Sequence, residues 1–312
     1  MTAGQRGKLA ALRAVTWLAC HLPERPLHRC FAAIGAALYL VDGTRRDLAR
    51  RNLTRICAWL VAEGRATPRV ARAARDRRAM DRLVRSAFSH HARYYLEVLR
   101  ISTLTGAYLE ARLDFGDWEP IRAGFRAVTE KRGLMYIGMH YASMEVPARY
   151  AILQTGAIAL TPMETVDDPA IQAWAEEQRQ PIGLEIIDPA RGGRRMLAYA
   201  REGGLLTVVG DRPLAGTARP VELFGAPAML PVGPALVAVE TGITCQIAVS
   251  RRTGLGTYEI DLHELAVPAP GGPLRERMAT FMAAEARAME GIVAVAPEQW
   301  WTCMYPIWDD IR

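Results

Sequence analysis

His140 and Glu145 are the residues of this 312-residue chain whose types and spacing best suit proton transfer. They lie in the stretch 133–150, GLMYIGMHYASMEVPARY. An imidazole accepts a proton near neutral pH, and a neighbouring carboxylate fixes its tautomer and raises its basicity. Residues five apart on one helix diverge by about 140°, so the two side chains can meet only if the chain turns between them. A buried histidine with an ordinary hydrogen-bond partner is the alternative interpretation of the same spacing.

A strand, a turn and a helix are the elements that must position this pair. Apolar residues 134–137 predict a short buried strand that stops at Gly138. His140 is then expected in the turn, and Glu145 in the first turn of the following helix, where the helix dipole favours a carboxylate. Ser143 is predicted to cap that helix. Its alternative role, a nucleophile beside His140, is less typical of a serine at a helix start.

Beyond residue 130 the sequence predicts an α/β fold with a mixed central sheet flanked by helices. Glu164 follows a predicted strand that ends at Leu160, and Asp211 and Arg212 follow the predicted strand 205–209. Ligands collect at the carboxyl ends of strands in such sheets, so these charged side chains are expected to gather near one site. The strands are predicted near 134–138, 157–160, 184–187, 205–209, 221–224, 245–249 and 258–262, and the helices near 144–154, 170–179, 193–201, 234–240 and 273–289.

The first hundred residues carry most of the positive charge, with 20 Lys or Arg against 7 Asp or Glu, whereas the remaining 212 residues have a net charge of −7. Residues 1–100 are therefore predicted to be an N-terminal amphipathic helical region, and residues 101–312 an α/β core. Basic residues beside apolar segments favour an anionic membrane surface as a partner. No zinc finger, RNA-recognition sequence or arginine-glycine repeat indicates nucleic acid.

Two apolar stretches within this region, 9–22 and 31–41, are separated by Pro23 and Pro26. Neither is long and apolar enough to cross a bilayer unaided, which takes about 20 apolar residues. The pair predicts a helical hairpin that lies on or dips into the membrane. An ordinary helical subdomain is the alternative.

The sequence offers no sign of a metal or cofactor. It has five scattered cysteines without a CxxC pair or a His/Cys cluster of metal-ligand spacing, which indicates reduced thiols in a cytosol-facing protein. It also lacks a GxSxG elbow, a P-loop and a GxGxxG fingerprint, so the usual hydrolase, NTPase and dinucleotide-binding motifs are absent.

Several motifs, in their order and spacing, resemble the bacterial lipid A biosynthesis (lauroyl/myristoyl) acyltransferases, a family that includes the phosphatidylinositol mannoside acyltransferases. The resemblance covers nearly the whole chain and rests on LPERPLHRCFAAIGAALYLV, RRDLARRNL, the H-x4-E pattern of MHYASME, VVGDRP and VELFGAPAMLPVGPALVAVETG. The tryptophan-rich tail PEQWWTCMYPIWDD is closer to the mannoside-acylating branch. The resemblance implies a lysophospholipid-acyltransferase-like fold with an N-terminal membrane-associating segment.

The resemblance also implies acyl transfer from a thioester of acyl carrier protein or coenzyme A to a hydroxyl or amine of a lipid or glycolipid. His140 falls on the family's general base and Glu145 on its acid. We expect Glu145 to bind the imidazole directly and Asp211 to hold the loop. The expected location is the cytoplasmic side of the cell (inner) membrane, as a peripheral or monotopic protein.

Other charged residues are predicted to serve the substrates of this reaction. Arg212 or Arg179 would supply a cation for the developing oxyanion. Glu164 would orient the acceptor or His140. Two alternatives remain open: an acyltransferase of this fold dedicated to a secondary-metabolite acceptor, and a catalytically inactive lipid-binding protein of the membrane surface.

Overall fold

The computed structural model describes residues 1–163, 166–189, 191–213 and 217–311. Its strands are β1 Leu113–Asp114, β2 Leu134–Gly138, β3 Ala159–Pro162, β4 Leu184–Ile187, β5 Leu205–Val209, β6 Ala218–Leu223, β7 Ala226–Pro231, β8 Thr244–Arg252 and β9 Tyr258–Leu265. Its α-helices are α1 Ala3–His21, α2 Glu24–Val41, α3 Gly43–Ala62, α4 Pro68–Arg75, α5 Arg77–Leu99, α6 Gly106–Glu110, α7 Glu119–Thr129, α8 Glu145–Thr155, α9 Pro169–Arg179, α10 Gly193–Arg201, α11 Gly233–Thr241 and α12 Leu274–Val295. Short 3-10 helices are η1 Ile101–Thr103, η2 Gln180–Ile182, η3 Pro297–Gln299 and η4 Trp301–Met304.

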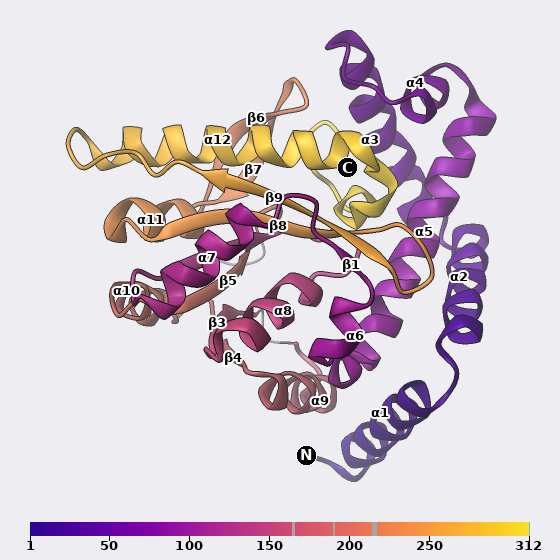
Figure 1. The fold of residues 1–312 in the computed structure, drawn as a ribbon. Coiled ribbons are helices and arrows are strands. Elements are labelled where there is room, and N and C mark those ends of the chain that lie inside the picture. Colours follow the sequence, from indigo (N-terminus) through magenta and orange to yellow (C-terminus); the bar gives the residue numbers. More distant parts are fainter. Residues whose placement is uncertain (164–165, 190, 214–216, 312) are drawn as a thin grey trace.

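A seven-stranded mixed sheet lies at the centre, in the order β1-β9-β8-β2-β5-β3-β4 (Figure 1). Strands β2, β3, β4, β5 and β8 run parallel, whereas β9 is antiparallel to β8. The two strands β6 and β7 form a separate antiparallel pair. The predicted mixed sheet is confirmed, and β2, which leads to His140, lies between β5 and β8.

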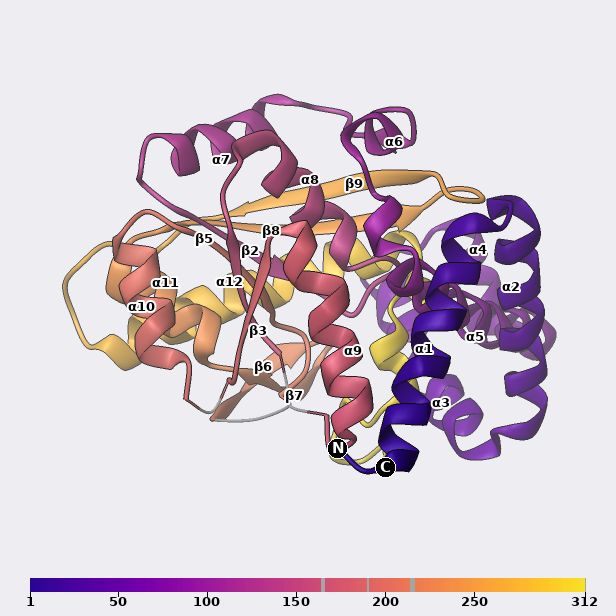
Figure 2. The same ribbon diagram turned by 90° about the horizontal axis from the view of Figure 1, so that it is seen from below.

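Helices cover both faces of the sheet because successive side chains of a strand point to opposite sides. Leu134 and Tyr136 of β2 pack in one core cluster with buried residues of α7 and α8. Met135 and Ile137 pack in a second cluster with residues of α10, α11 and α12. Figure 2 shows α7 and α8 on one side of the sheet and α11 and α12 on the other. The apolar run 134–137 is therefore buried on both faces, as predicted.

The N-terminal helices lie along one side of this core (Figures 1 and 2). Helix α1 packs against α9, where Trp174 Nε1 donates a hydrogen bond to Thr16 Oγ1 at 2.9 Å. Helix α2 packs against α5, at a point where a Cβ added to Gly35 would lie 2.6 Å from Ser89 Cα. Helices α1 and α2 pack on different helices and not on each other, so the predicted pairing into a hairpin is wrong. The predicted association of these helices with a membrane stays a prediction.

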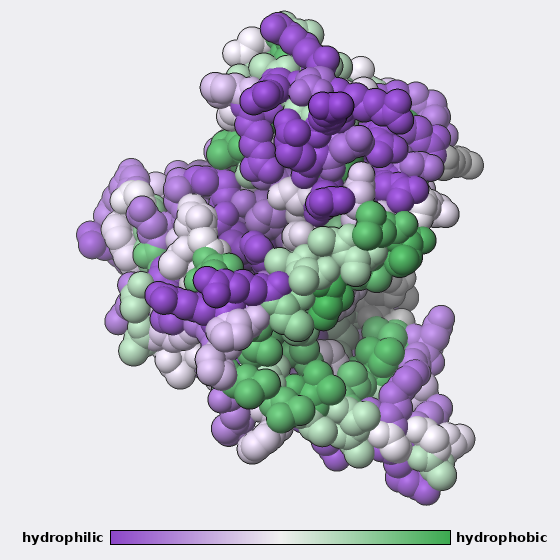
Figure 3. Space-filling model, turned by 90° about the vertical axis from the view of Figure 1, so that its right-hand side faces the viewer, coloured by the Kyte–Doolittle hydropathy of each residue, from purple (hydrophilic) through white to green (hydrophobic). Residues whose placement is uncertain are grey.

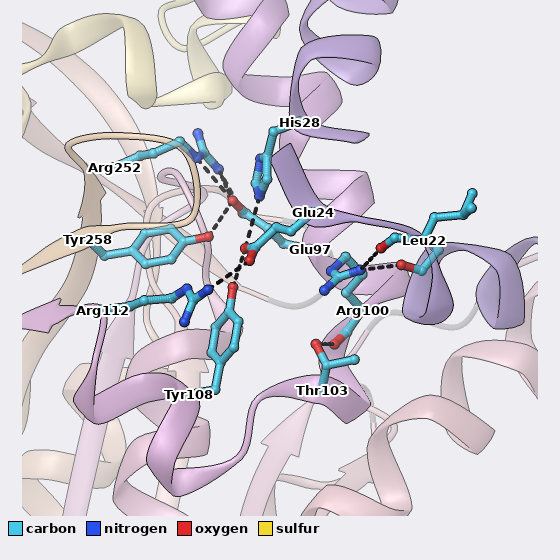
Figure 4. Close-up of polar contacts among 11 residues, drawn as sticks. Leu22, Glu24, His28, Glu97, Arg100, Thr103, Tyr108, Arg112, Arg252 and Tyr258 are labelled. Atoms are coloured by element: carbon cyan, nitrogen blue, oxygen red, sulfur yellow. Dashed lines mark hydrogen bonds and ion pairs between the residues drawn. The ribbon is translucent and has the colours of Figure 1, made fainter. Parts of the chain in front are cut away.

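A buried carboxylate of α5 fastens this helix to the sheet (Figure 4). Glu97 accepts hydrogen bonds from Arg252 Nη2 at 2.7 Å and from Tyr258 Oη at 2.6 Å, on β8 and β9. All three side chains are buried. This network joins residues on both sides of the predicted boundary at residue 100. The boundary itself stays a prediction.

A second carboxylate, Glu24, fastens the start of α2 in the same way (Figure 4). It accepts hydrogen bonds from Arg112 Nη2 at 3.0 Å and from Tyr108 Oη, and it lies 3.5 Å from His28 Nε2. Burial alone would raise the pKa of Glu24, but hydrogen bonds from His28 and Tyr108 and the charge of Arg112 outweigh it and lower the pKa to about 2. The helix is thus held by a network of ionic hydrogen bonds as well as by apolar packing.

No helix in the described ranges is both long and apolar enough to span a bilayer.

Candidate active site

His140 lies just beyond β2 and is paired with Asp211, just beyond β5. The distance between His140 Nδ1 and Asp211 Oδ1 is 2.7 Å, and the backbone N–H of His140 donates to Asp211 Oδ2 at 3.0 Å. The two residues meet because β2 and β5 are parallel neighbours with Gly138 opposite Val209. The pairing fixes both the imidazole ring and the loop that carries it.

The prediction that Glu145 is the direct partner of the imidazole is wrong. Glu145 begins α8 as predicted, but its Oε1 accepts hydrogen bonds from Arg179 Nη2 at 2.9 Å and from Tyr94 Oη at 3.3 Å. Its other oxygen, Oε2, is buried without a hydrogen-bond partner among the described residues. The predicted turn is present, but it directs Glu145 toward α5 and α9 and leaves the adjacent strand end to supply the partner of His140.

Asp211 is the most fully hydrogen-bonded carboxylate of the site. Besides His140, its Oδ2 accepts from Trp300 Nε1 at 2.6 Å and from Thr302 Oγ1 at 2.7 Å. Burial alone would raise the pKa of Asp211, but the charge of His140 and the hydrogen bonds from His140, Trp300 and Thr302 lower it below its usual value. Asp211 is therefore a stable carboxylate that accepts Nδ1–H and leaves Nε2 of His140 as the proton acceptor.

The C-terminal segment around η3 and η4 holds the loop of His140 in place. Ala142 N donates to Gln299 O at 2.9 Å, and Trp301 N donates to His140 O at 3.0 Å. The Trp301 ring meets the His140 ring edge to face, with 4.5 Å between the ring centroids. Ala142 has a φ of 43°, a left-handed conformation that costs a residue with a Cβ free energy. The contacts from 299–302 stabilise this strained loop.

Sequence reasoning missed Trp300, Trp301 and Thr302 as parts of the site. The tail was used only as a mark of one branch of the family, and its two adjacent tryptophans were the available signal. The prediction for Ser143 is wrong: α8 has Met144 at its N-cap, and the Ser143 hydroxyl is buried without a hydrogen-bond partner among the described residues. With no hydrogen bond to His140, the hydroxyl also lacks the activating contact that a nucleophile needs.

A cavity of about 450 Å³ adjoins His140. Apolar side chains form most of its wall, which comes from β3, β5, α10, the end of β7 and α11: Met144, Pro162, Met163, Val166, Pro189, Met196, Leu197, Val208, Val209, Pro231, Val232, Pro234, Leu236 and Val237. Among the residues that the structure describes, His140 and Arg212 are the ionisable members of the wall. The volume lies in the range of ligand-binding pockets.

The structure separates the two predicted cations. Arg212 lines this cavity, and its guanidinium carbon lies 4.3 Å from the centroid of the Tyr305 ring. Arg179 lines a smaller pocket of about 110 Å³ with its ion-pair partner Glu145. Met144 and Met163 belong to the walls of both cavities, so the two adjoin. Glu164 lies outside the described residues, and its predicted role stays a prediction.

A third buried carboxylate, Glu285 of α12, lies behind the site. Both of its oxygens lack hydrogen-bond partners among the described residues, and the side chain is fully buried. Burial, followed by the charge of Asp211, raises the pKa of Glu285 well above its usual value. The two carboxyl groups thus shift in opposite directions, and the negative charge is favoured on Asp211.

No group of three or more His, Cys, Asp and Glu side chains in the part of the chain that the structure describes is arranged to hold a metal ion.

A mixed α/β sheet that presents a carboxylate-bound histidine beside an apolar cavity is suited to transferring an apolar group. The family model for the bacterial lipid A biosynthesis acyltransferases matches residues 7–304. The chain therefore belongs to this family, and it is an acyltransferase.

Characterised relatives of the chain include two phosphatidylinositol mannoside acyltransferases. The one from Mycobacterium tuberculosis (strain CDC 1551 / Oshkosh) is 26% identical over 237 residues, which cover 73% of this chain and 68% of the relative. The one from Mycolicibacterium smegmatis is 24% identical over 230 residues, which cover 71% of this chain and 67% of the relative. The predicted family resemblance is confirmed.

Proposed function

We propose that this protein transfers a fatty acyl group from an acyl thioester to a hydroxyl or amine of a lipid or glycolipid, with His140 as the general base. The observation that carries the proposal is the bond between His140 Nδ1 and Asp211, which leaves Nε2 to accept a proton beside an apolar cavity. Phosphatidylinositol mannoside acyltransferases among the relatives support a glycolipid acceptor. The donor would be acyl carrier protein or coenzyme A carrying the acyl group.

The reaction is a direct transfer without an acyl-enzyme. The acceptor oxygen or nitrogen attacks the thioester carbonyl carbon while Nε2 of His140 takes the acceptor proton. The new bond to the acyl carbon gives a tetrahedral intermediate, whose collapse breaks the carbon–sulfur bond. The proton on His140 then neutralises the departing thiolate, so the base returns to its starting state. Asp211 stabilises the imidazolium between these two steps.

Arg212 is placed to stabilise the oxyanion of the intermediate. Its charge lies in the wall of the same cavity as His140, and a fixed cation in an apolar environment acts strongly on developing negative charge. Arg179 is not available in the same way, because it is paired with Glu145. Of the two predicted cations, Arg212 is therefore the one that we assign to the reaction.

The apolar cavity is the proposed site for the acyl chain. Its wall has few polar groups, and burying a hydrocarbon chain there removes apolar surface from water. Met196, Leu236 and Val237 belong to the part of the wall that α10 and α11 supply. These side chains would limit the length of the chain that the enzyme accepts.

Mass spectrometry of the acceptor tests the reaction. Lipid and glycolipid acceptors are incubated with acyl-CoA and acyl carrier protein thioesters of different chain lengths, and the gain of an acyl group is measured. His140→Ala is expected to lower the rate by about 10² to 10⁴-fold, whereas His263→Ala, which removes an exposed histidine of β9, should leave it unchanged. A folded His140→Ala protein with the normal rate would refute the proposal.

The membrane is the proposed source of the acceptor, on its cytoplasmic side. Helices α1 and α2 expose large apolar side chains, among them Trp17 (59% exposed), Leu40 (64%) and Val41 (78%). Figure 3 shows apolar side chains gathered over this side of the molecule next to a strongly hydrophilic area. Apolar side chains beside basic ones suit the surface of an anionic bilayer.

Co-sedimentation with anionic liposomes tests this surface. Because α1 and α2 also pack against α9 and α5, substitutions are a sharper test than removal of residues 1–42. The triple variant Trp17→Ser, Leu40→Ser, Val41→Ser should bind liposomes more weakly. Ile158→Ser, at an apolar residue that is 54% exposed elsewhere on the chain, is the matched control. Equal binding by both variants would place the membrane contact elsewhere.

A further inference from the structure

Two arginines from distant parts of the chain converge on the ring of Tyr305. The guanidinium carbon of Arg212, after β5, lies 4.3 Å from the ring centroid, and that of Arg45, in the first turn of α3, lies 5.8 Å away. Both lie at distances typical of cation–π contacts. Tyr305 thus carries two positive charges near one ring.

The backbone that carries this ring is held by the core. Asn52 is fully buried, and its Nδ2 donates hydrogen bonds to the carbonyl oxygens of Tyr305 and Cys303, each at 2.8 Å. The same C-terminal segment holds the loop of His140 through Trp301. The backbone of Tyr305 is therefore tied to the loop of the active site.

Little negative charge offsets this pair. Arg212 has no carboxylate partner among the described residues. Arg45 approaches Asp42 only through Nε, at 3.7 Å, and its side chain is 48% exposed. Both arginines lie close enough to Tyr95 to lower the pKa of its hydroxyl, although burial and the neighbouring Tyr305 raise that pKa overall. Asp42 is thus only a distant counter-charge for Arg45, and a second cation at the same ring favours binding of an anion.

The position of the pair relative to the cavity limits what the anion can be. Arg212 belongs to the same cavity wall as His140, whereas Arg45 and Tyr95 line a separate hollow of about 140 Å³ between α2 and α5. The reacting carbonyl must lie near His140, with its hydrocarbon chain in the cavity. The polar parts of the substrates then lie outside this apolar cavity, whose wall includes Arg212.

We propose that Arg45, which contacts the same Tyr305 ring as Arg212 but lies outside the cavity, binds a phosphoryl group of a substrate. This inference rests on the proposed function and specifies its substrates. Guanidinium groups match phosphate oxygens through paired N–H donors, which an ammonium group cannot do. Two sources share this chemistry: the phosphoryl groups beyond the pantetheine arm of the donor, and the phosphodiester of an acceptor phospholipid.

Paired ligands that differ by little more than a phosphoryl group test the site by direct binding. For the donor, dissociation constants are measured by calorimetry for palmitoyl-4′-phosphopantetheine and for palmitoyl-pantetheine. For the acceptor, nonionic detergent micelles carry either phosphatidylmethanol, which keeps the phosphodiester without a sugar, or diacylglycerol. The variants are Arg45→Gln and Arg82→Gln. Arg82 is an exposed arginine of α5, so its substitution removes the same charge away from Tyr305.

The native protein should prefer the phosphorylated member of at least one pair. Arg45→Gln should reduce that preference about tenfold, the effect of losing one charged hydrogen bond, and Arg82→Gln should keep it. A loss confined to the first pair assigns the site to the donor, and a loss confined to the second assigns it to the acceptor. Equal preferences in both variants, or no preference in the native protein, would overturn the proposal.

These binding measurements are independent of catalysis. An active His140→Ala protein would refute the proposed general base and leave the phosphoryl preference intact. Loss of the phosphoryl preference would refute the arginine site without affecting the role of His140. The two proposals therefore fail by different measurements.

Discussion

Asp211 and Glu145 are two buried carboxylates at the same end of the sheet, and they differ in how completely they are hydrogen-bonded. Asp211 accepts bonds from the backbone and the ring of His140, from Trp300 and from Thr302. Glu145 accepts bonds on one oxygen only, from Arg179 and Tyr94. The comparison shows that a carboxylate five residues away along the chain can be a worse partner than one on the neighbouring strand, because parallel strands bring their carboxyl ends together.

The largest effect is expected from Asp211→Asn. The asparagine amide can donate an N–H to Nδ1 of His140 and so favour the wrong imidazole tautomer. The substitution also removes the negative charge of Asp211. We expect the rate of acyl transfer to fall by about 10³ to 10⁴-fold. The acidic limb of the pH–rate profile should move to lower pH, because the imidazolium loses its counter-charge. Steady-state rates measured from about pH 5 to about pH 9, a range that includes the titration of a histidine, give both changes.

The same substitution has a consequence for stability that separates Asp211 from Glu145. The pKa of Asp211 is lower in the folded protein than in the unfolded chain. Its charged form therefore stabilises the fold above the unfolded pKa, and this contribution is lost as the pH falls through the folded pKa. Denaturation of Asp211→Asn should show less loss of stability in acid than the native protein shows. An unchanged acid dependence would contradict this assignment.

An intermediate effect is expected from Glu145→Gln, mainly on stability. The substitution removes the charge that pairs with Arg179, whose side chain is only 13% exposed. A buried charge that has lost its partner lowers the free energy of unfolding by about 3 kcal/mol. Urea denaturation measures this loss. The acidic limb of the pH–rate profile should stay in place.

A matched double variant sharpens this prediction. Glu145→Met with Arg179→Met removes both charges, so it should recover part of the lost stability. A shift of the acidic limb in Glu145→Gln would restore Glu145 as the partner of His140 and reverse the comparison.

The smallest effect is expected from Glu285→Gln. The pKa of Glu285 is raised in the folded protein, so the native protein loses stability as the pH rises above the unfolded pKa of this carboxyl group. The amide of Glu285→Gln cannot ionise. The free energy of unfolding of this variant should therefore increase relative to that of the native protein by about 1 kcal/mol per pH unit over part of this range. Urea denaturation of both proteins at about pH 5, 6 and 7 measures how the difference in their free energies of unfolding changes with pH. A difference that does not change with pH would show that Glu285 is already ionised in the fold.

The sequence was a good guide to the parallel strands and a poor guide to what holds their ends. The runs 134–138 and 205–209 are strongly apolar, and both strands were predicted correctly. Strand β7 was missed because Pro227 and Pro231 argue against a strand, although they are tolerated in this separate two-stranded pair. Helices α6 and α7 were also missed, and β1 has only two residues.

The rest of the site depends on contacts that leave no local pattern. Thr302 reaches Asp211 from the 3-10 helix η4, and Trp300 from the single residue between η3 and η4. Such short segments show no periodicity. The choice between Glu145 and Asp211 depended on the direction in which the chain turns after His140. Spacing alone established that a turn must exist, but not which carboxylate it brings within hydrogen-bond distance.

The dependence of the His140 loop on residues 299–302 has a consequence for the order of events during synthesis. His140 and the strand before it leave the ribosome long before Trp300 and Thr302 are made. The sheet can begin to form from the earlier strands, since folding proceeds from the N-terminal side during translation. The imidazole, however, is not oriented until the later segment has docked on Asp211 and on the loop. If His140 is the base, as proposed above, acyl transfer can begin only after residues 299–302 have left the ribosome.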